Sequence, residues 1–312
     1  MNKEPISNIN LYGLENYFKE FISLYDENRL PNKILFSGKK GLGKSTLAYH
    51  IVNYICSQNE DNKYDKINNI INIENKSFKL IQNNTHPNFY LIDIFQGKKN
   101  IDIEQIRTMI AFTNKSNFND NPRFVLIDNI ESLNKNSINA LLKIVEEPKK
   151  NLFFILIHNN ETKILPTLIS RCLTFKINLN FNEVVSVSNR IMNENIFELL
   201  NENLVNHYCS PGQIFKLINY ATEKKIDLKN QSLEELLISL IDNNSYKKNT
   251  YVKELLIDLI QLFFLKKYKL SNNKNNFIKI YHDFMNKIYN TNKFNLDEES
   301  LFLEFKKKLL NV

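Results

Sequence analysis

Over the first 178 residues, short apolar runs alternate with longer amphipathic stretches. The runs are rich in aromatic and β-branched residues, a composition typical of strands that are buried on both faces of a parallel sheet. They cover residues 33–37, 89–94, 123–128, 152–157 and 173–177. This alternation predicts an α/β fold, in which a parallel sheet lies between two layers of helices and ligands bind at the carboxyl ends of the strands.

Three stretches between the runs place apolar residues at helical spacing. They are residues 45–56, 101–113 and 137–147. Asp102 and Gln105 stand three residues apart at the start of the second stretch, so they can cap its first turn. Pro148 should end the third stretch. By contrast, residues 59–69 are polar and aperiodic, which predicts an exposed loop or a short insertion.

Beyond residue 178 the strand pattern fades, and helical spacing continues along the rest of the chain. Residues 179–222 read as a short helical unit that is interrupted by the sequence CSPG. Residues 223–312 carry helices with apolar faces wide enough for a bundle. Within them, the apolar cluster at 262–265 fits a bundle core better than an oligomer contact. We therefore predict three parts, with boundaries after residues 178 and 222.

Composition adds little to this picture. The 312 residues carry a formal net charge of +7, which fits a polyanionic partner. Lysine, asparagine and isoleucine are frequent throughout the chain, however, so charge alone leaves nucleic-acid binding open. No apolar run approaches 18 residues and no signal peptide is apparent, which predicts a cytoplasmic protein. Cys56, Cys172 and Cys209 are too far apart to suggest a disulfide framework or a zinc cluster.

Residues 38–45, GKKGLGKS, match the phosphate-binding pattern GxxxxGK[ST] at every position, although the chain has only 6 glycines. Glycines let backbone N–H groups approach a phosphate closely. The lysine supplies positive charge to the β- and γ-phosphates, and the serine hydroxyl can bind Mg²⁺. A strand-like run precedes the pattern and a helix follows it, as a phosphate-binding loop requires. The predicted nucleotide-binding residues here are Gly38, Gly41, Gly43, Lys44, Ser45 and Thr46.

A carboxylate at the tip of the third apolar run completes this constellation. Asp128 ends the sequence RFVLID, where an aspartate can hold the Mg²⁺ ion that Ser45 also contacts. An apolar run followed by aspartate is a weak signal when taken alone. It becomes specific through its distance from the phosphate-binding loop and through the residues that follow it.

The residues after Asp128 carry a family resemblance. Residues 123–148, RFVLIDNIESLNKNSINALLKIVEEP, are followed by LFFILIHNN and by the triplet SRC at 170–172. Together with THPN at 85–88 and IDIEQIR at 101–107, this sequence resembles the clamp-loader branch of the AAA+ ATPases. Within that branch it is most similar to the delta-prime subunits of bacterial DNA polymerase III. The resemblance covers most of residues 10–178 closely and the later helices only by pattern.

The resemblance implies an AAA+ P-loop domain at 1–178, a small helical lid at 179–222 and a C-terminal helical collar at 223–312 that joins subunits. It implies ATP or ADP with Mg²⁺ as the bound cofactor. The implied partners are other clamp-loader subunits of gamma/tau and delta types, the sliding clamp and primer-template DNA, without a membrane. Lys143 could face DNA, but a solvated helix lysine is the simpler interpretation.

The resemblance also implies roles for two residues. Arg171 matches the arginine finger that a loader subunit offers to ATP held by its neighbour, where a planar guanidinium would neutralise charge on the γ-phosphate. An ion pair within its own chain is the alternative for this arginine. Asn159 stands where these proteins place a sensor that hydrogen-bonds the γ-phosphate or the attacking water, and ordinary loop chemistry is its alternative. His86 and His158 are interpreted as structural.

Three departures from the family pattern affect the functional interpretation. Active members place a glutamate after the Mg²⁺-binding aspartate, but this chain has Asn129, and an amide cannot accept the proton of an attacking water. Glu131, two residues later, is expected to face elsewhere. In the lid, Gln213 stands where we align an arginine that touches the γ-phosphate. Finally, the 59–69 segment lacks the cysteine-rich zinc module of many relatives, so no zinc is predicted.

The leading hypothesis is a delta-prime-like subunit that binds nucleotide and supplies Arg171 in trans to a neighbouring ATPase subunit during clamp loading. It would belong to the DNA-directed DNA polymerase holoenzyme, with weak or absent ATPase activity of its own. The first alternative is an autonomous motor of gamma/tau type, which predicts an acidic residue at 129 and an arginine near 213. The second is a non-catalytic scaffold with a vestigial phosphate-binding loop. A small-molecule kinase is improbable, because the SRC segment and the helical C-terminal half have no role in one.

Overall fold

The computed structural model describes residues 4–95, 98, 100–114, 121–146, 149–247, 249–271, 273–294 and 296–307. The chain divides into two compact units, Met1–Glu183 and Val184–Val312. The first unit contains all the described strands, and the second contains only helices and their connections. Among the described residues, no helix is long and apolar enough to cross a membrane.

The first unit is built on a sheet of five parallel strands in the order β2-β3-β4-β1-β5. All five predicted strands are present, so the sequence-based prediction of the sheet is confirmed. Their bounds are β1 Lys33–Ser37, β2 Phe89–Ile92, β3 Arg123–Ile127, β4 Leu152–His158 and β5 Leu173–Lys176. Because β4 lies between β1 and β3, the end of β4 separates the phosphate-binding loop from the end of β3.

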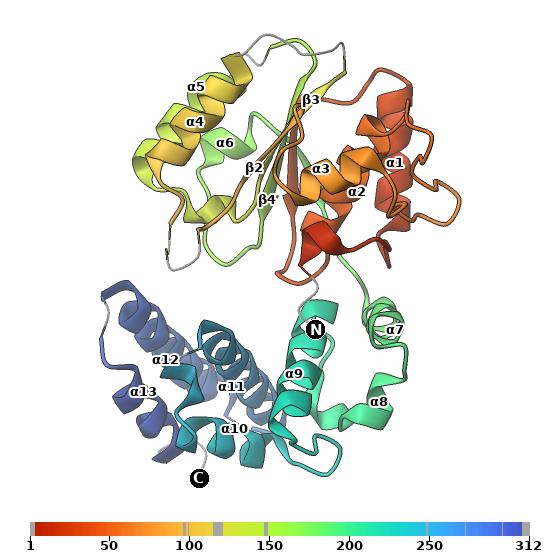
Figure 1. Ribbon diagram of the computed structural model, residues 1–312. Coiled ribbons are helices and arrows are strands. Elements are labelled where there is room, and N and C mark those ends of the chain that lie inside the picture. Colours follow the sequence, from red (N-terminus) through yellow and green to blue (C-terminus); the bar gives the residue numbers. More distant parts are fainter. Residues whose placement is uncertain are drawn as a thin grey trace. The chain divides into compact units, whose positions relative to one another are not determined.

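Alternate residues of each central strand enter two different cores. In β1, Ile34 and Phe36 belong to the core on one face of the sheet, and Leu35 belongs to the core on the other. Strand residues point alternately to the two faces, so each central strand is buried on both sides. Helices α1 (Glu15–Asp26), α2 (Lys44–Cys56) and α3 (Lys76–Gln82) contribute to the first core. Helices α4 (Ile103–Asn114), α5 (Lys135–Glu146) and α6 (Pro166–Ile169) contribute to the second (Figure 1).

The helix caps follow the local sequence. The side chain of Gln105 accepts a hydrogen bond from the backbone N–H of Asp102 at 3.0 Å, so the predicted cap of α4 is present. Helix α5 begins two residues before its predicted start, and the Asn134 side chain accepts a bond from the backbone N–H of Ser137 at 2.8 Å. The predicted end of α5 at residues 147–148 lies outside the described residues.

The 59–69 segment is irregular, as predicted, but it is not wholly exposed. Tyr64 is buried within the core of the first unit, and its ring centroid lies 5.0 Å from that of Phe18. Its hydroxyl is 2.8 Å from Nδ1 of the fully buried His50, whose Nε2 lies 3.1 Å from the carbonyl oxygen of Asn8. A carbonyl only accepts, so Nε2 carries the proton and Nδ1 accepts from the tyrosine. A single aromatic anchor in a polar run gives no periodic signal, which is why the sequence missed it.

The second unit is a set of helices arranged around α11 (Figure 1). Helix α11 (Thr250–Leu270) packs against α9, α10 and α12. The other helices are α7 Phe181–Met192, α8 Ile196–Leu199, α9 Pro211–Lys224, α10 Leu233–Asp242, α12 Lys274–Phe294 and α13 Glu298–Phe305. Helix α9 of the expected lid and α11 of the expected collar thus share one compact unit, and a separate lid and collar remain a prediction.

An aromatic cluster forms the centre of the helical unit. Phe264 of α11 is 2% exposed, and its ring centroid lies within 6.0 Å of those of five described neighbours, Phe263, Phe277, Tyr281, Phe284 and Phe305. Leu262 and Phe263 are buried as well. The apolar cluster at 262–265 is therefore largely bundle core, as the sequence predicted.

We expect Phe264→Ala to lower the free energy of unfolding of the helical unit by about 3–5 kcal/mol, because the change leaves a cavity in a closed aromatic cluster. Phe294→Ala is the matched control, since Phe294 is 60% exposed at the end of α12. Urea unfolding of the full chain, followed by circular dichroism, measures both. Equal losses in the two variants would show that the cluster does not carry the stability of this unit.

Burial lowers the pKa of His50 to about 4. In the unfolded chain His50 binds a proton below about pH 6.5, whereas the folded chain resists protonation until about pH 4. Stability is therefore lost as the pH falls through this window, with a slope of at most about 1.4 kcal/mol per pH unit from this residue. We expect His50→Gln to reduce the loss of stability between pH 7 and pH 5 in urea titrations. His158→Gln, at a histidine that is more exposed than His50, is the matched control for the substitution itself.

Candidate nucleotide-binding site

The loop between β1 and α2 has a backbone that only glycine can adopt at several positions. A Cβ atom on Gly38 would lie 2.3 Å from the carbonyl oxygen of Ile177, a distance that no real contact tolerates. Gly41 and Gly43 have φ angles of 83° and 89°, in the left-handed region that favours glycine. Sterics or backbone conformation therefore favour glycine at all three positions of the pattern. The resulting tight loop leads directly to the N-terminus of α2.

Lys44, the first residue of α2, closes this loop from within. Its Nζ donates hydrogen bonds to the carbonyl oxygens of Gly38 and Lys39, both at 2.7 Å. The side chain is almost fully buried, and burial lowers the pKa of Lys44 to about 8, against the opposing attraction of Asp128 and Glu131. The ammonium group thus lies among backbone carbonyls and carboxylates, where a phosphate oxygen would be a stronger partner.

Ser45 and Asp128 meet at the carboxyl end of β3. The Ser45 hydroxyl donates to Oδ2 of Asp128 at 2.5 Å, so the two oxygens predicted to bind Mg²⁺ are adjacent. Burial, and after it the nearby carboxylate of Asp93, raise the pKa of Asp128 to about 6. Hydrogen bonds from Ser45 and from the backbone N–H of Asn129 oppose this rise. A cation bound between the two oxygens would favour the ionised carboxylate.

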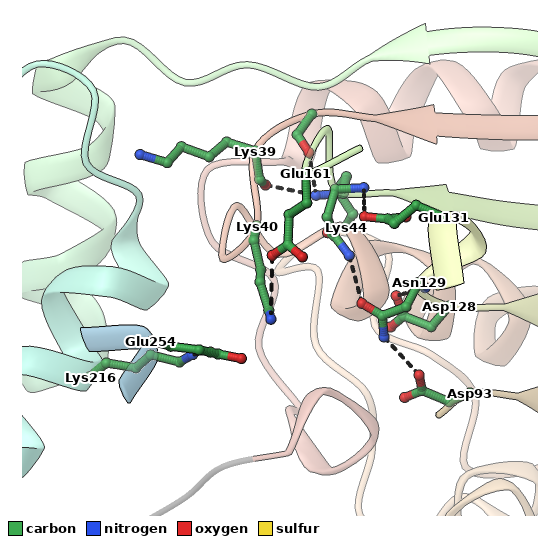
Figure 2. Close-up of polar contacts among 12 residues, drawn as sticks. Lys39, Lys40, Lys44, Asp93, Asp128, Asn129, Glu131, Glu161, Lys216 and Glu254 are labelled. Carbon is green, nitrogen blue, oxygen red and sulfur yellow. Dashed lines mark hydrogen bonds and ion pairs between the residues drawn. The ribbon is translucent and has the colours of Figure 1, made fainter. Parts of the chain in front are cut away.

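Side-chain amides connect the ends of three neighbouring strands. Asn129 follows β3, and its Nδ2 donates to Oδ1 of Asp93, just beyond β2, at 2.7 Å (Figure 2). The Oδ1 atom of Asn129 accepts from Nδ2 of Asn159, just beyond β4, at 2.8 Å. Asn159 is 8% exposed. The structure therefore brings Asn159 to the same sheet edge as Lys44 and Asp128, while its predicted sensor role stays a prediction.

Glu131 belongs to this site, and the expectation that it faces elsewhere is wrong. Its Oε1 accepts a hydrogen bond from the backbone N–H of Asn159 at 3.0 Å, and its charge raises the pKa of Lys44 against the effect of burial. Its Oε2 is buried without a hydrogen-bond partner among the described residues. Asn129 adopts the left-handed conformation, with φ 53° and ψ 49°, and begins a short 3₁₀ turn at Ile130–Ser132. That turn brings Glu131 back toward the site.

Asp93 was not predicted from the sequence as a residue of this site. It lies inside the apolar run at 89–94 that was predicted as a strand, whereas β2 ends at Ile92 and leaves Asp93 at the strand end. The sequence does not state, however, that β2 pairs with β3. In the sheet Ile92 is paired with Ile127, so Asp93 and Asp128 leave neighbouring strands side by side.

Arg171 lies between α6 and β5 and is paired within its own chain. Its Nη1 donates to the carbonyl oxygen of Thr167 at 2.8 Å, and its Nη2 contacts Oε1 of Glu146 at 2.5 Å. The side chain of Arg171 is 34% exposed and that of Glu146 is 50% exposed. An exposed ion pair of this kind contributes about 0–1 kcal/mol, so it is readily exchanged for a better partner.

The remaining predicted residues have local partners. Gln213 forms a capping box with Ser210 at the start of α9, which gives its side chain a structural role in the second unit. Thr46 accepts a hydrogen bond from the Asn8 side chain at 3.4 Å. His158 bonds the carbonyl oxygen of Thr162 at 2.8 Å, and His86 accepts from the backbone N–H of Asn88 at 3.2 Å, so both have structural contacts.

These observations fit a magnesium-bound nucleotide. Glycines give the loop its tight backbone, Lys44 supplies a buried positive charge, and the Ser45 and Asp128 oxygens are hard ligands of the kind that Mg²⁺ prefers. Three or more His, Cys, Asp or Glu side chains grouped as metal ligands do not occur among the described residues.

The sequence was compared with known proteins. Residues 13–180 match the family described as DNA polymerase III, delta subunit. The DNA polymerase III subunit delta′ of Buchnera aphidicola subsp. Schizaphis graminum is 25% identical over 272 residues, which are 82% of this chain and 78% of that protein. The delta′ subunit of Escherichia coli is 26% identical over 156 residues, 50% of this chain and 45% of that protein.

A gamma-type relative and a solved structure extend this comparison. The DNA polymerase III subunit gamma of Buchnera aphidicola subsp. Baizongia pistaciae is 30% identical over 216 residues, 67% of this chain and 55% of that protein. The crystal structure of a gamma subunit-related protein from Thermotoga maritima superposes with a TM-score of 0.52 at 16% identity, covering 95% of this chain and 98% of the other. That likeness concerns the fold alone, and it agrees with an AAA+ domain followed by helices. The family match at residues 13–180 covers more than half of this chain, which therefore belongs to the DNA polymerase III, delta subunit family.

Proposed function

We propose that this chain is a delta-prime-like subunit of a DNA polymerase III clamp loader, which binds nucleotide and supplies Arg171 in trans to an ATPase subunit beside it. The observation that carries the proposal is the combination of a complete phosphate-binding loop with an amide at position 129. The loop keeps its glycines, Lys44 and the Ser45–Asp128 pair. The position that would activate water holds a side chain with no basic atom.

Magnesium-bound ATP or ADP is the ligand that the loop residues suit. The backbone N–H groups of residues 38–45 and the Lys44 ammonium would bind the phosphates, and Ser45 with Asp128 would hold the ion. When bound, the ion would neutralise phosphate charge. In this chain Lys44 must release the two carbonyl oxygens that it now bonds, and Ser45 must release Asp128 as its hydrogen-bond acceptor.

Hydrolysis by the isolated chain is expected to be very slow. Asn129 uses its amide to connect Asp93 and Asn159, and an amide cannot take a proton from water. Glu131 is another carboxylate at this sheet edge, but one of its oxygens accepts the backbone N–H of Asn159. The site thus has the groups that bind a nucleotide and lacks a placed base.

Arg171 suits a role on a neighbouring subunit. The Arg171 guanidinium is about one-third exposed and is held by the exposed Glu146 carboxylate and by the Thr167 carbonyl, so it can leave Glu146 for a phosphate at low cost. The gamma and delta′ names of the relatives support gamma/tau-type and delta-type subunits as neighbours. The sliding clamp and primer-template DNA follow as partners of the assembled loader, and a cytoplasmic location follows from this role.

Two alternatives make different predictions. An autonomous motor of gamma/tau type is disfavoured by the amide at position 129, although gamma subunits are among the relatives. A scaffold with a vestigial loop would not need glycine at positions 38 and 43. This chain nevertheless keeps glycine at both positions, where a Cβ atom would clash or the backbone would be strained. Nucleotide titration separates the scaffold from the proposed function.

We expect the full chain to bind Mg²⁺-ATP or Mg²⁺-ADP in isothermal titration calorimetry, and Lys44→Ala to weaken that binding at least about tenfold, because a charge-assisted phosphate contact of about 1.5–3 kcal/mol is lost. Lys63→Ala is the matched control, since Lys63 is an exposed lysine of the 59–69 segment. Absence of nucleotide binding by the wild-type chain would favour the scaffold. Brisk turnover by the isolated wild-type chain would favour the motor.

We expect Arg171→Ala to reduce the ATPase rate of a loader reconstituted with gamma-type subunits by about 10³-fold or more, the range that arginine fingers supply. Nucleotide binding by the isolated variant should match the wild type. Arg107→Ala is the control, because Arg107 is another exposed, ion-paired arginine of this unit. Glu146→Gln, which frees Arg171 from its ion pair, should keep a wild-type rate or exceed it. A wild-type rate from the Arg171→Ala loader would exclude the trans role.

A further inference from the structure

A row of polar side chains crosses the ends of three neighbouring strands. Asp93 follows β2, Asn129 follows β3 and Asn159 follows β4, and these strands are adjacent in the sheet. The Asp93–Asn129 bond is 2.7 Å and the Asn129–Asn159 bond is 2.8 Å. The row thus connects a residue outside the predicted nucleotide site to the residue predicted to sense the γ-phosphate.

The chemistry of the three groups fixes the direction of both bonds. An ionised carboxylate only accepts hydrogen bonds, so Asn129 must turn its NH₂ group toward Asp93. Its carbonyl oxygen then faces Asn159 and can only accept, so Asn159 must present its own NH₂ group. The orientation of an amide is set by its bonding network, and here the network starts at one charged end. The carboxylate of Asp93 therefore determines, through Asn129, that the nitrogen end of the Asn159 amide faces Asn129.

Both ends of the row are anchored to the fold. The backbone carbonyl of Asp93 accepts from Nε2 of Gln105 at 2.8 Å, and the other end of that glutamine caps α4 through Asp102. At the far end, Glu131 holds the backbone N–H of Asn159 at 3.0 Å. The Asn159 side chain is thus fixed through Asn129, and its backbone is fixed separately through Glu131.

We propose that Asp93 is a positioning residue that, through Asn129, holds the Asn159 amide with its nitrogen toward the nucleotide site and thereby sets the preference of the site for a nucleoside triphosphate over a diphosphate. The proposal rests on the proposed function, because it takes the loop as a nucleotide site. An amide nitrogen is a donor and suits a γ-phosphate oxygen, whereas an amide oxygen in its place would repel that phosphate. A diphosphate has no γ-phosphate and is indifferent to the orientation of Asn159.

In this arrangement, asparagine at position 129 is required for the two hydrogen bonds of the row. Its backbone is in the left-handed region, which asparagine adopts more readily than glutamate does. A glutamate introduced there would place a second carboxylate against Asp93, where like charges at hydrogen-bond distance disfavour ionisation. Asn129 is therefore both compatible with the turn and necessary for the row.

The test compares nucleotides on the full chain carrying Asp93→Asn, an isosteric change that removes the fixed acceptor. We expect the affinity for a non-hydrolysable ATP analogue with Mg²⁺ to fall about tenfold, the loss of one hydrogen bond to a charged group, while ADP affinity changes less than about twofold. Asp61→Asn, at an exposed aspartate, is the matched control and should alter neither affinity. Equal weakening of both nucleotides would mark Asp93 as merely structural and overturn the proposal, as would unchanged affinities.

A second measurement does not depend on nucleotide. In ¹⁵N-resolved spectra of the wild-type chain without ligand, the side-chain NH₂ protons of Asn129 and Asn159 should exchange slowly with solvent, and Asp93→Asn should accelerate the exchange of both. Fast exchange in the wild type would overturn the row itself. If the wild-type chain binds no nucleotide, the proposed function fails, and slow exchange would still support the row of hydrogen bonds.

Discussion

The insertion of β4 between β1 and β3 is the constraint on which the site depends. In a parallel sheet all strands end at the same edge, so the order of the strands decides which end residues become neighbours. With β4 in that position, the end of β4 lies between the phosphate-binding loop that follows β1 and Asp128 that follows β3. The hydrogen bond from the backbone N–H of Gly38 to the carbonyl of His158, at 3.2 Å, continues this pairing into the loop itself.

The same edge explains how binding and catalysis can separate in this chain. The proposed phosphate binding would use the loop after β1, the start of α2 and Asp128 after β3, and these carry the glycines, lysine, serine and aspartate of the pattern. Water activation needs a base at the next position, where an amide has instead become part of the connection between strand ends. In the proposed function, a single side chain would remove hydrolysis without disturbing nucleotide binding, because the two would use different atoms of one sheet edge.

Much of the fold was predictable because buried parallel strands are almost wholly apolar, and all five runs proved to be strands. The loop and Asp128 were predictable because their pattern is local in sequence. Asp93 and Glu131 were not, since the contacts of Asp93 depend on strand order and those of Glu131 on a left-handed turn at Asn129. Tyr64 was missed for a related reason: one buried aromatic in a polar segment has no periodicity to detect.

The buried state of Lys44 has a consequence for the ligand-free loop. Among the described residues, this lysine hydrogen-bonds to two backbone carbonyls, and with a pKa of about 8 it is close to neutrality under mildly alkaline conditions. A phosphate placed against it would stabilise the ammonium form and raise the pKa again. Above about pH 8, the proposed nucleotide binding would therefore be accompanied by proton uptake, so the affinity of the loop for nucleotide would fall as the pH rises.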